Sequence, residues 1–310
     1  MGRKRVSIRW RIAASFVLVL LLLGGAPALA ASSETLGEET APETAEEQDE
    51  APVATKKGAA VPMNSNCPEG WGGDDARTLG AGWLYSWGTR PPLVNGVESV
   101  PMLWDEFDGC PELGGNSEWV MGFNERDHFG LANLSPEEGA EQWRQVEQCY
   151  PDKKLLSPAP AFGTTWLEEM REAYIAASGE APRFDAVAMH CYGGDGFVPG
   201  CQRKARSYAT KLEAWDVPGG LWLTEFGCVD PDREVQVENM EQALAWVETD
   251  PHITRYSWFA TRYKGDEVWA FGTDHTTALA ACESGELTAL GELYVEAEAY
   301  SQIFLPFVMR

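Results

Sequence analysis

Short apolar runs alternate with longer amphipathic runs along most of this chain, and this alternation restricts it to few folds. Glycine and proline bound the apolar runs, which is typical of buried parallel strands. Strands that alternate with helices predict a parallel sheet covered by helices. The predicted strands are 79–85, 97–104, 119–123, 154–157, 186–190, 221–224 and 255–260.

The segment from Val61 to Arg310 has the length of one barrel domain. We therefore expect an α/β fold, a single (β/α)8 TIM barrel. The apolar pattern does not identify the eighth strand, and we expect a short or irregular one between Cys67 and Arg77.

Helix starts are clearer than strand ends. Ser135-Pro136-Glu137-Glu138 places a capping serine, a first-turn proline and a glutamate three residues after the cap. A second capping box is expected at Thr165 and Glu168. Further helices are predicted at 204–215, 234–248 and 287–300.

The first sixty residues differ from the rest. A basic stretch, an apolar run and Ala28-Leu29-Ala30 predict a signal peptide over residues 1–30, with an N-terminal membrane anchor as the alternative. Residues 31–60 are acidic and contain no aromatic residue, which predicts a disordered linker. An acidic interaction tail is the alternative. We expect a secreted (extracellular or periplasmic) protein that does not stay on the membrane after signal cleavage.

The formal net charge of −24 makes nucleic acids and anionic membranes poor partners, whereas a neutral, hydroxyl-rich ligand remains compatible. Seven cysteines in an exported chain predict disulfides with one cysteine left over. Cys191, Cys201 and Cys228 are expected to approach one another. Neither CxxC nor HExxH occurs, so we expect no metal site. We also expect no cofactor and a monomer.

Two glutamates follow apolar runs in matching contexts. Glu125 follows Val120-Met121-Gly122-Phe123-Asn124, and Glu225 follows Leu221-Trp222-Leu223-Thr224. Active sites of (β/α)8 barrels lie at the carboxyl ends of the strands. Two carboxyl groups there can hydrolyse a glycosidic bond, one as acid and one as nucleophile or base. The alternative is that each is a solvated loop carboxylate.

Other polar and aromatic residues follow predicted strands. Asn124 could bind a sugar hydroxyl, or it could cap its loop. His190 could contact substrate or the acid, and Tyr192 could hold the nucleophile ionised; both could instead belong to the core. Tryptophans could supply flat faces for sugar rings, although each alone fits a core position better. They are Trp258, Trp83 and Trp104, with Trp87 as a possible extension.

Six motifs occur in one order between residues 79 and 298, and this series resembles the Asl1-like glycosyl-hydrolase catalytic-core family, glycoside hydrolase family 128. They are Gly82-Trp83-Leu84-Tyr85-Ser86-Trp87-Gly88, Val100-Pro101-Met102-Leu103-Trp104, Gly122-Phe123-Asn124-Glu125, His190-x-Tyr192-Gly193, Trp222-Leu223-Thr224-Glu225-Phe226-Gly227 and Arg255-Tyr256-Ser257-Trp258-Phe259-Ala260. The resemblance implies a retaining (β/α)8 enzyme that hydrolyses β-1,3-glucan. It also implies an acid/base after strand four, here Glu125, and a nucleophile at strand seven, here Glu225.

The chain departs from the family pattern at two positions. Arg126 stands where the family usually has proline, and Cys191 stands where it usually has an aromatic residue. Arg126 could weaken a general acid if its charge faced Glu125, but we expect it to point away. The resulting expectation is a secreted retaining endo-β-1,3-glucanase. A non-catalytic β-glucan-binding protein on the same barrel is the alternative.

Overall fold

The computed structural model describes residues 55–62, 67, 73–105, 107–131, 133–264, 268 and 272–298. All of them belong to one compact unit, Gln48–Arg310. The expected signal peptide and most of the expected linker lie outside the described residues. No helix in the described part of the chain is long and apolar enough to cross a bilayer.

The described residues contain eight strands, which form three parallel sheets whose spatial order follows the chain. Isolated parallel bridges connect neighbouring sheets, pairing Met102 with Met121, Leu156 with Ala186 and Lys57 with Tyr256. The parallel α/β class is thus confirmed, while the hydrogen-bonded strands remain three sheets rather than one closed sheet. The sheets are β1 (Gly58–Ala60), β2 (Trp83–Tyr85) and β3 (Glu98–Val100); β4 (Trp119–Met121) and β5 (Lys154–Leu156); and β6 (Val187–Gly193), β7 (Leu221–Cys228) and β8 (Ile253–Trp258).

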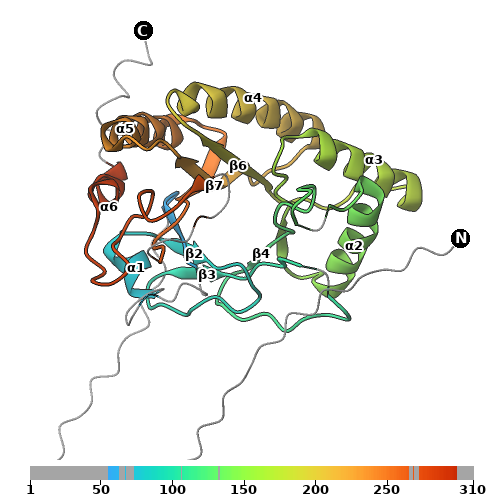
Figure 1. The fold of residues 1–310 in the computed structure, drawn as a ribbon. Coiled ribbons are helices and arrows are strands. Elements are labelled where there is room, and N and C mark those ends of the chain that lie inside the picture. Colours follow the sequence, from blue (N-terminus) through green and yellow to red (C-terminus); the bar gives the residue numbers. More distant parts are fainter. Residues whose placement is uncertain are drawn as a thin grey trace, which may run out of the picture. The chain divides into compact units, whose positions relative to one another are not determined.

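Helices lie outside the strands (Figure 1). The capping box of Ser135 and Glu138 is confirmed, but helix α3 begins at Thr165, whose expected role as N-cap is wrong. No described helix separates β2 from β3 or β3 from β4, so the alternation is incomplete in the first half. The helices are α1 (Gly73–Thr78), α2 (Pro136–Cys149), α3 (Thr165–Ser178), α4 (Phe197–Trp215), α5 (Arg233–Thr249) and α6 (Ala289–Val295).

Alternation along the strands separates two of the three core clusters that the described residues form. In β7, Leu221 and Leu223 pack in the larger cluster with residues of the helices, whereas Trp222 between them packs in a second cluster. Side chains of successive strand residues point to opposite faces, which explains the division. Trp222 lies 5.3 Å from Trp83 and 4.8 Å from Trp119 between ring centroids, so tryptophans fill the inner side of the strands.

The first strand lies where the sequence predicted a linker. β1 is Gly58–Ala60, so the linker does not extend to residue 60, and the region expected to hold the eighth strand contains helix α1. A Cβ atom on Gly58 would stand 2.2 Å from the Trp83 ring, so only glycine fits there. Lys57 Nζ donates to the carbonyls of Tyr294 and Val295 at the end of α6, an arrangement favoured by the helix dipole.

Three disulfides join Cys67 to Cys282, Cys110 to Cys149, and Cys191 to Cys201. Cys228 is the buried free cysteine, which accounts for the odd count. Two of the three cysteines expected to meet are therefore bonded. The third, Cys228, pairs in register with Gly193, two residues beyond Cys191 on β6.

Candidate active site

Glu125 follows β4 in a conformation that few residues adopt. Its φ is 46°, in the left-handed region, where residues other than glycine are strained. The Glu125 N–H donates to Ala159 O at 2.9 Å, and the Glu125 carbonyl accepts from His128 N at 2.9 Å. These bonds hold the turn, and Glu125 is buried, with 3% of the residue's surface exposed.

Glu225 lies within β7 rather than after it, and a bulge sets its direction. On β6, Met189 pairs with Leu223 and the next residue, His190, pairs with Glu225. One extra residue, Thr224, therefore stands between the paired positions of β7. A bulge of this kind reverses the faces of the residues that follow it. Glu225 thus faces the same side as His190, where strict alternation would have turned it outward.

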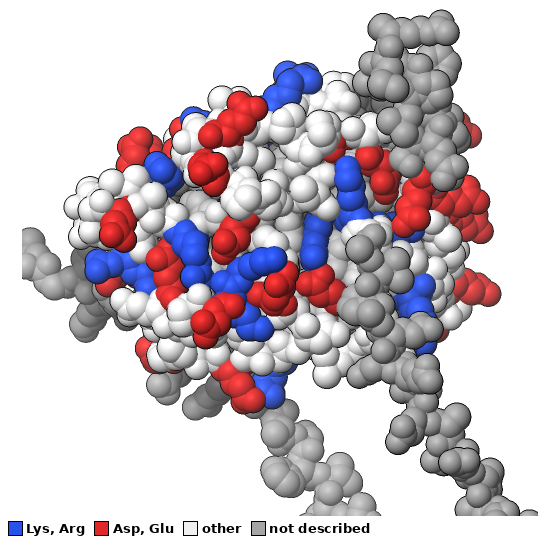
Figure 2. Space-filling model, turned by 180° about the vertical axis from the view of Figure 1, so that it is seen from behind, with Lys and Arg blue, Asp and Glu red and all other residues white. Residues whose placement is uncertain are grey.

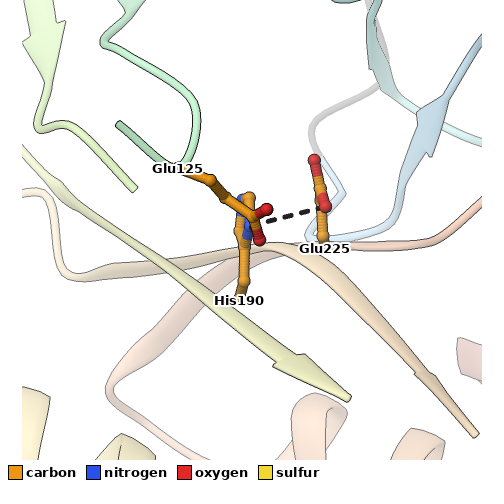
Figure 3. Close-up of side chains that lie close together, drawn as sticks. All are labelled: Glu125, His190 and Glu225. Carbon is orange, nitrogen blue, oxygen red and sulfur yellow. Dashed lines mark hydrogen bonds and ion pairs between the residues drawn. The ribbon is translucent and has the colours of Figure 1, made fainter. Parts of the chain in front are cut away.

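The side chains of Glu125, His190 and Glu225 point toward one another (Figure 3). His190 Nδ1 lies 2.9 Å from Glu125 Oε1 and 3.4 Å from Glu225 Oε2. One ligand atom from each of the three side chains lies within 4.8 Å of the others. Two carboxyl groups and an imidazole therefore share one buried space.

Two donors bind the oxygens of Glu225. Trp87 Nε1 donates to Oε1 at 2.9 Å, and the Tyr192 hydroxyl donates to Oε2 at 2.5 Å. Burial raises the pKa of Glu225 and the charge of Glu125 adds to this, while His190, Tyr192 and Trp87 oppose it. Burial and the nearby carboxylates raise the pKa of Tyr192, so its hydroxyl remains a donor. The two hydrogen bonds favour the ionised form of Glu225.

His190 is wholly buried between the carboxyls. Burial opposes its protonation, but the charge of Glu225 and the contact with Glu125 outweigh burial, and the pKa of His190 is raised. Its Nε2 atom has no hydrogen-bond partner among the described residues, nor has Asn124 Oδ1. His190 contacts the carboxyl pair and Asn124 directly precedes Glu125, so a bound hydroxyl would find a partner at these buried polar atoms.

Arg126 bonds to Asp105 and is itself buried, with 4% of its side chain exposed. Its guanidinium carbon lies 5.9 Å from the centre of the Phe123 ring. The contact with Asp105 provides a counter-charge from the segment after β3. The expectation that Arg126 points away from Glu125 stays a prediction.

Some of the tryptophans expected to bind sugar are buried and others are not. Trp258 is fully buried, its Nε1 donating to Thr277 O at 2.8 Å, and Trp83 is 1% exposed. Neither ring can present a face to a sugar, so these two expectations are wrong, because both rings complete the core. Trp104 is 38% exposed after β3, and Trp87 reaches Glu225 directly.

Three stacked rings in loops that follow β4 and β5, one half-buried and two exposed, were not singled out from the sequence. His128 lies 4.7 Å from Phe129 and 5.3 Å from Phe162 between ring centroids, with interplanar angles of 18°. We call His128, Phe129 and Phe162 the outer aromatic group. Phe129 is 79% exposed and Phe162 is 61% exposed. Their positions in loops after β4 and β5 were the signal that sequence reasoning could have used.

The trio of Glu125, His190 and Glu225 also meets the distance requirement for a metal ion. The tryptophan N–H that reaches Glu225 can only donate, and the tyrosine hydroxyl also donates to this carboxylate. Donors aimed at both oxygens favour the ionised carboxylate without a cation. We therefore assign no metal to this site.

The surface shown in Figure 2 carries basic and acidic side chains side by side. No continuous basic area occurs among the described residues on that face. Together with the net charge of −24, this mixture agrees with the expectation of a neutral ligand rather than a polyanion.

The family model described as "Glycosyl hydrolase catalytic core" matches residues 63–294. No curated protein sequence matches the chain.

Several solved structures share the fold. An endo-β-1,3-glucanase of glycoside hydrolase family 128, subgroup II, from Sorangium cellulosum is 27% identical, with a TM-score of 0.64, covering 78% of this chain and 98% of its own. A subgroup I endo-β-1,3-glucanase from Amycolatopsis mediterranei, in complex with laminaritriose, is 23% identical, with a TM-score of 0.59 and coverages of 78% and 99%. A subgroup VII oligosaccharide-binding protein from Cryptococcus neoformans is 20% identical, with a TM-score of 0.58 and coverages of 80% and 95%.

Proposed function

Because this chain belongs to the glycosyl hydrolase catalytic-core family, glycoside hydrolase family 128, and is therefore a glycoside hydrolase, we propose that it is a retaining endo-β-1,3-glucanase. Glu225 is the nucleophile and Glu125 the acid/base. The observation that carries the proposal is the approach of the two carboxyl groups, which have one oxygen each within 4.8 Å. Retaining enzymes hold their carboxyls about 5–5.5 Å apart, whereas inverting enzymes leave room for a water.

The eight parallel strands and the bridges between their sheets support a (β/α)8 barrel. In such a barrel, Glu125 after β4 and Glu225 on β7 lie at the carboxyl ends of the strands. The sequence pattern had not identified β1. With β1 counted as the first strand, Glu125 follows strand four and Glu225 lies on strand seven, as the family resemblance implies.

The hydrogen bonds of Glu225 support its assignment as nucleophile. In the first step a Glu225 oxygen attacks the anomeric carbon while the Glu125 proton moves to the glycosidic oxygen, and the leaving sugar departs. In the second step Glu125 takes a proton from water, whose oxygen attacks the anomeric carbon and releases Glu225. Trp87 and Tyr192 keep Glu225 oriented and ionised before the first step.

The contact between His190 and Glu125 lets the two residues share the proton that the acid step needs. One proton can occupy either end of this 2.9 Å contact. In the first arrangement the imidazole is charged and Glu125 is ionised. In the second the imidazole is neutral and Glu125 is protonated. The second arrangement is the reactive one, because the acid then carries the proton that the leaving oxygen needs. The raised pKa of His190 keeps this proton in the site.

Exposed aromatic rings in loops after the strands support a polysaccharide substrate. Phe129, Phe162 and Trp104 offer exposed aromatic faces in the loops after β4, β5 and β3, which suits sugar rings. The Sorangium cellulosum relative acts on β-1,3-glucan, which supports this linkage for the present chain. Three disulfides agree with an extracellular protein, and we propose that residues 1–30 are the signal that exports it.

One test separates this function from the second candidate, a non-catalytic glycan-binding protein, which the oligosaccharide-binding Cryptococcus neoformans relative favours. The purified protein should release reducing sugar from laminarin. Glu225→Ala should abolish release, and azide should rescue it on an activated aryl β-glucoside with formation of the inverted glycosyl azide. The control Glu172→Ala, on the exposed face of α3, should behave like wild type. Binding of laminarin without hydrolysis by the wild-type protein would favour the binding function.

A further inference from the structure

Lys204 on helix α4 donates hydrogen bonds to two backbone carbonyls of segments that contact the proposed acid/base. Its Nζ donates to His190 O at 2.7 Å and to Ala161 O at 3.2 Å. The first carbonyl belongs to the histidine that contacts Glu125, and the second belongs to the loop after β5. A single ammonium group therefore connects β6 with that loop.

Asp127 extends this connection to Glu125. Its carboxylate accepts from Ala161 N at 2.8 Å and from Phe162 N at 3.2 Å. The Ala161 residue is thus bound at its N–H by Asp127 and at its carbonyl by Lys204. Two residues earlier, Ala159 O accepts the Glu125 N–H. The loop after β5 is in this way fixed to the turn that carries Glu125.

Charges around the ammonium act on the same residues. Burial lowers the pKa of Lys204 to about 8, while the charges of Glu125 and Asp127 oppose this. Lys204 in turn lowers the pKa of His190, although the carboxylates keep that pKa raised overall. At neutral pH a positive charge therefore stands close to both members of the pair that exchanges the proton.

We propose that Lys204 is a positioning residue for the Glu125–His190 pair: it holds the backbone on both sides of the pair, through His190 O and Ala161 O. The inference rests on the proposed function. It assigns a role in the reaction to a helix residue outside the carboxyl pair. The alternative is that Lys204 only attaches α4 to the strands.

Two substitutions of Lys204 and one control distinguish these roles. Lys204→Met removes the charge, and Lys204→Arg keeps it. Lys211→Met is the matched control, because Lys211 lies on the same helix and bonds to Glu168 at 2.7 Å, on α3. We expect Lys204→Met to lower kcat on laminarin by about 10- to 100-fold, Lys204→Arg to recover at least a third of the wild-type kcat, and Lys211→Met to match wild type.

The pH dependence supplies a readout that an attachment role would not change. The alkaline limb of the pH–rate profile reports loss of the proton from the acid. It should move to higher pH in Lys204→Met, because a neighbouring positive charge is gone, and should stay in place in Lys204→Arg. The pKa of His190, followed by NMR of the imidazole without any turnover, should rise in Lys204→Met for the same reason.

A fall in kcat with the alkaline limb and the His190 titration both unmoved would overturn the proposal and leave Lys204 an attachment residue. Unchanged kcat in Lys204→Met would overturn it as well. If the wild-type protein does not hydrolyse laminarin, the proposed function fails, while the His190 titration still decides whether Lys204 acts on the pair. Should Lys204→Met not fold, wild-type His190 should show a second NMR step near pH 8 that Lys204→Arg lacks.

Discussion

Substituting Tyr192 by phenylalanine tests the environment of the proposed nucleophile with the smallest change. The variant loses one hydroxyl group, which donates to Glu225 Oε2 at 2.5 Å. A hydrogen bond to a charged group contributes about 1.5–3 kcal/mol. One pH unit corresponds to about 1.4 kcal/mol, so the ionised form of Glu225 should become harder to reach by about one to two pH units.

The direction of the effect follows from the balance at Glu225. Burial raises the pKa of Glu225, and Tyr192 is one of the groups that hold it down. Removing the donor should move the acidic limb of kcat/KM to higher pH, because this limb reports ionisation of the nucleophile. The loss of kcat/KM should reach about 10- to 100-fold on the acidic side and shrink toward alkaline pH.

A second tyrosine provides the control. Tyr208 is fully buried on α4, and its hydroxyl has no hydrogen-bond partner among the described residues. Tyr208→Phe should therefore leave the pH–rate profile unchanged. An acidic limb of Tyr192→Phe that stays in place, or moves to lower pH, would refute the assignment of Tyr192 as the donor that keeps Glu225 ionised.

Four further outcomes are expected. Glu125→Gln should stop hydrolysis of laminarin but still release an activated aryl leaving group; equal losses on both substrates would make Glu125 structural. Glu225→Gln should raise Tm at pH 7, because burial raises the pKa of Glu225. The stability linked to the Glu225 proton is complete below the ordinary carboxyl pKa and is lost as pH rises through the raised pKa. The gain in Tm should therefore vanish in scans near pH 3. Arg126→Met should change kcat/KM by less than about tenfold, since Arg126 pairs with Asp105; a large gain, with the alkaline limb moved upward, would show that its charge acts on the acid. Phe162→Ala should raise KM for laminarin about 3- to 10-fold with kcat nearly unchanged, and an unaltered KM would remove this ring from the substrate site.

Much of the fold was predictable because its signals are local. The apolar runs that became β4 to β8 and the capping box at Ser135 depend on neighbouring residues alone. The first strand was not predictable, since Gly58–Ala60 contains no branched or aromatic residue. It forms because Trp83 needs a glycine opposite it and Lys57 binds the end of α6, and both partners are distant in sequence.

The sequence by itself determined which residue types serve the site: two glutamates after apolar runs, with a histidine and a tyrosine after another. Only the tertiary structure decided where these side chains point. A bulge at Thr224 turns Glu225 inward, and a left-handed φ re-aims Glu125, while Trp83 and Trp258 fill the core and Trp87 reaches the carboxylate. Direction and burial depend on strand register and on residues far along the chain, which a pattern of neighbours does not contain.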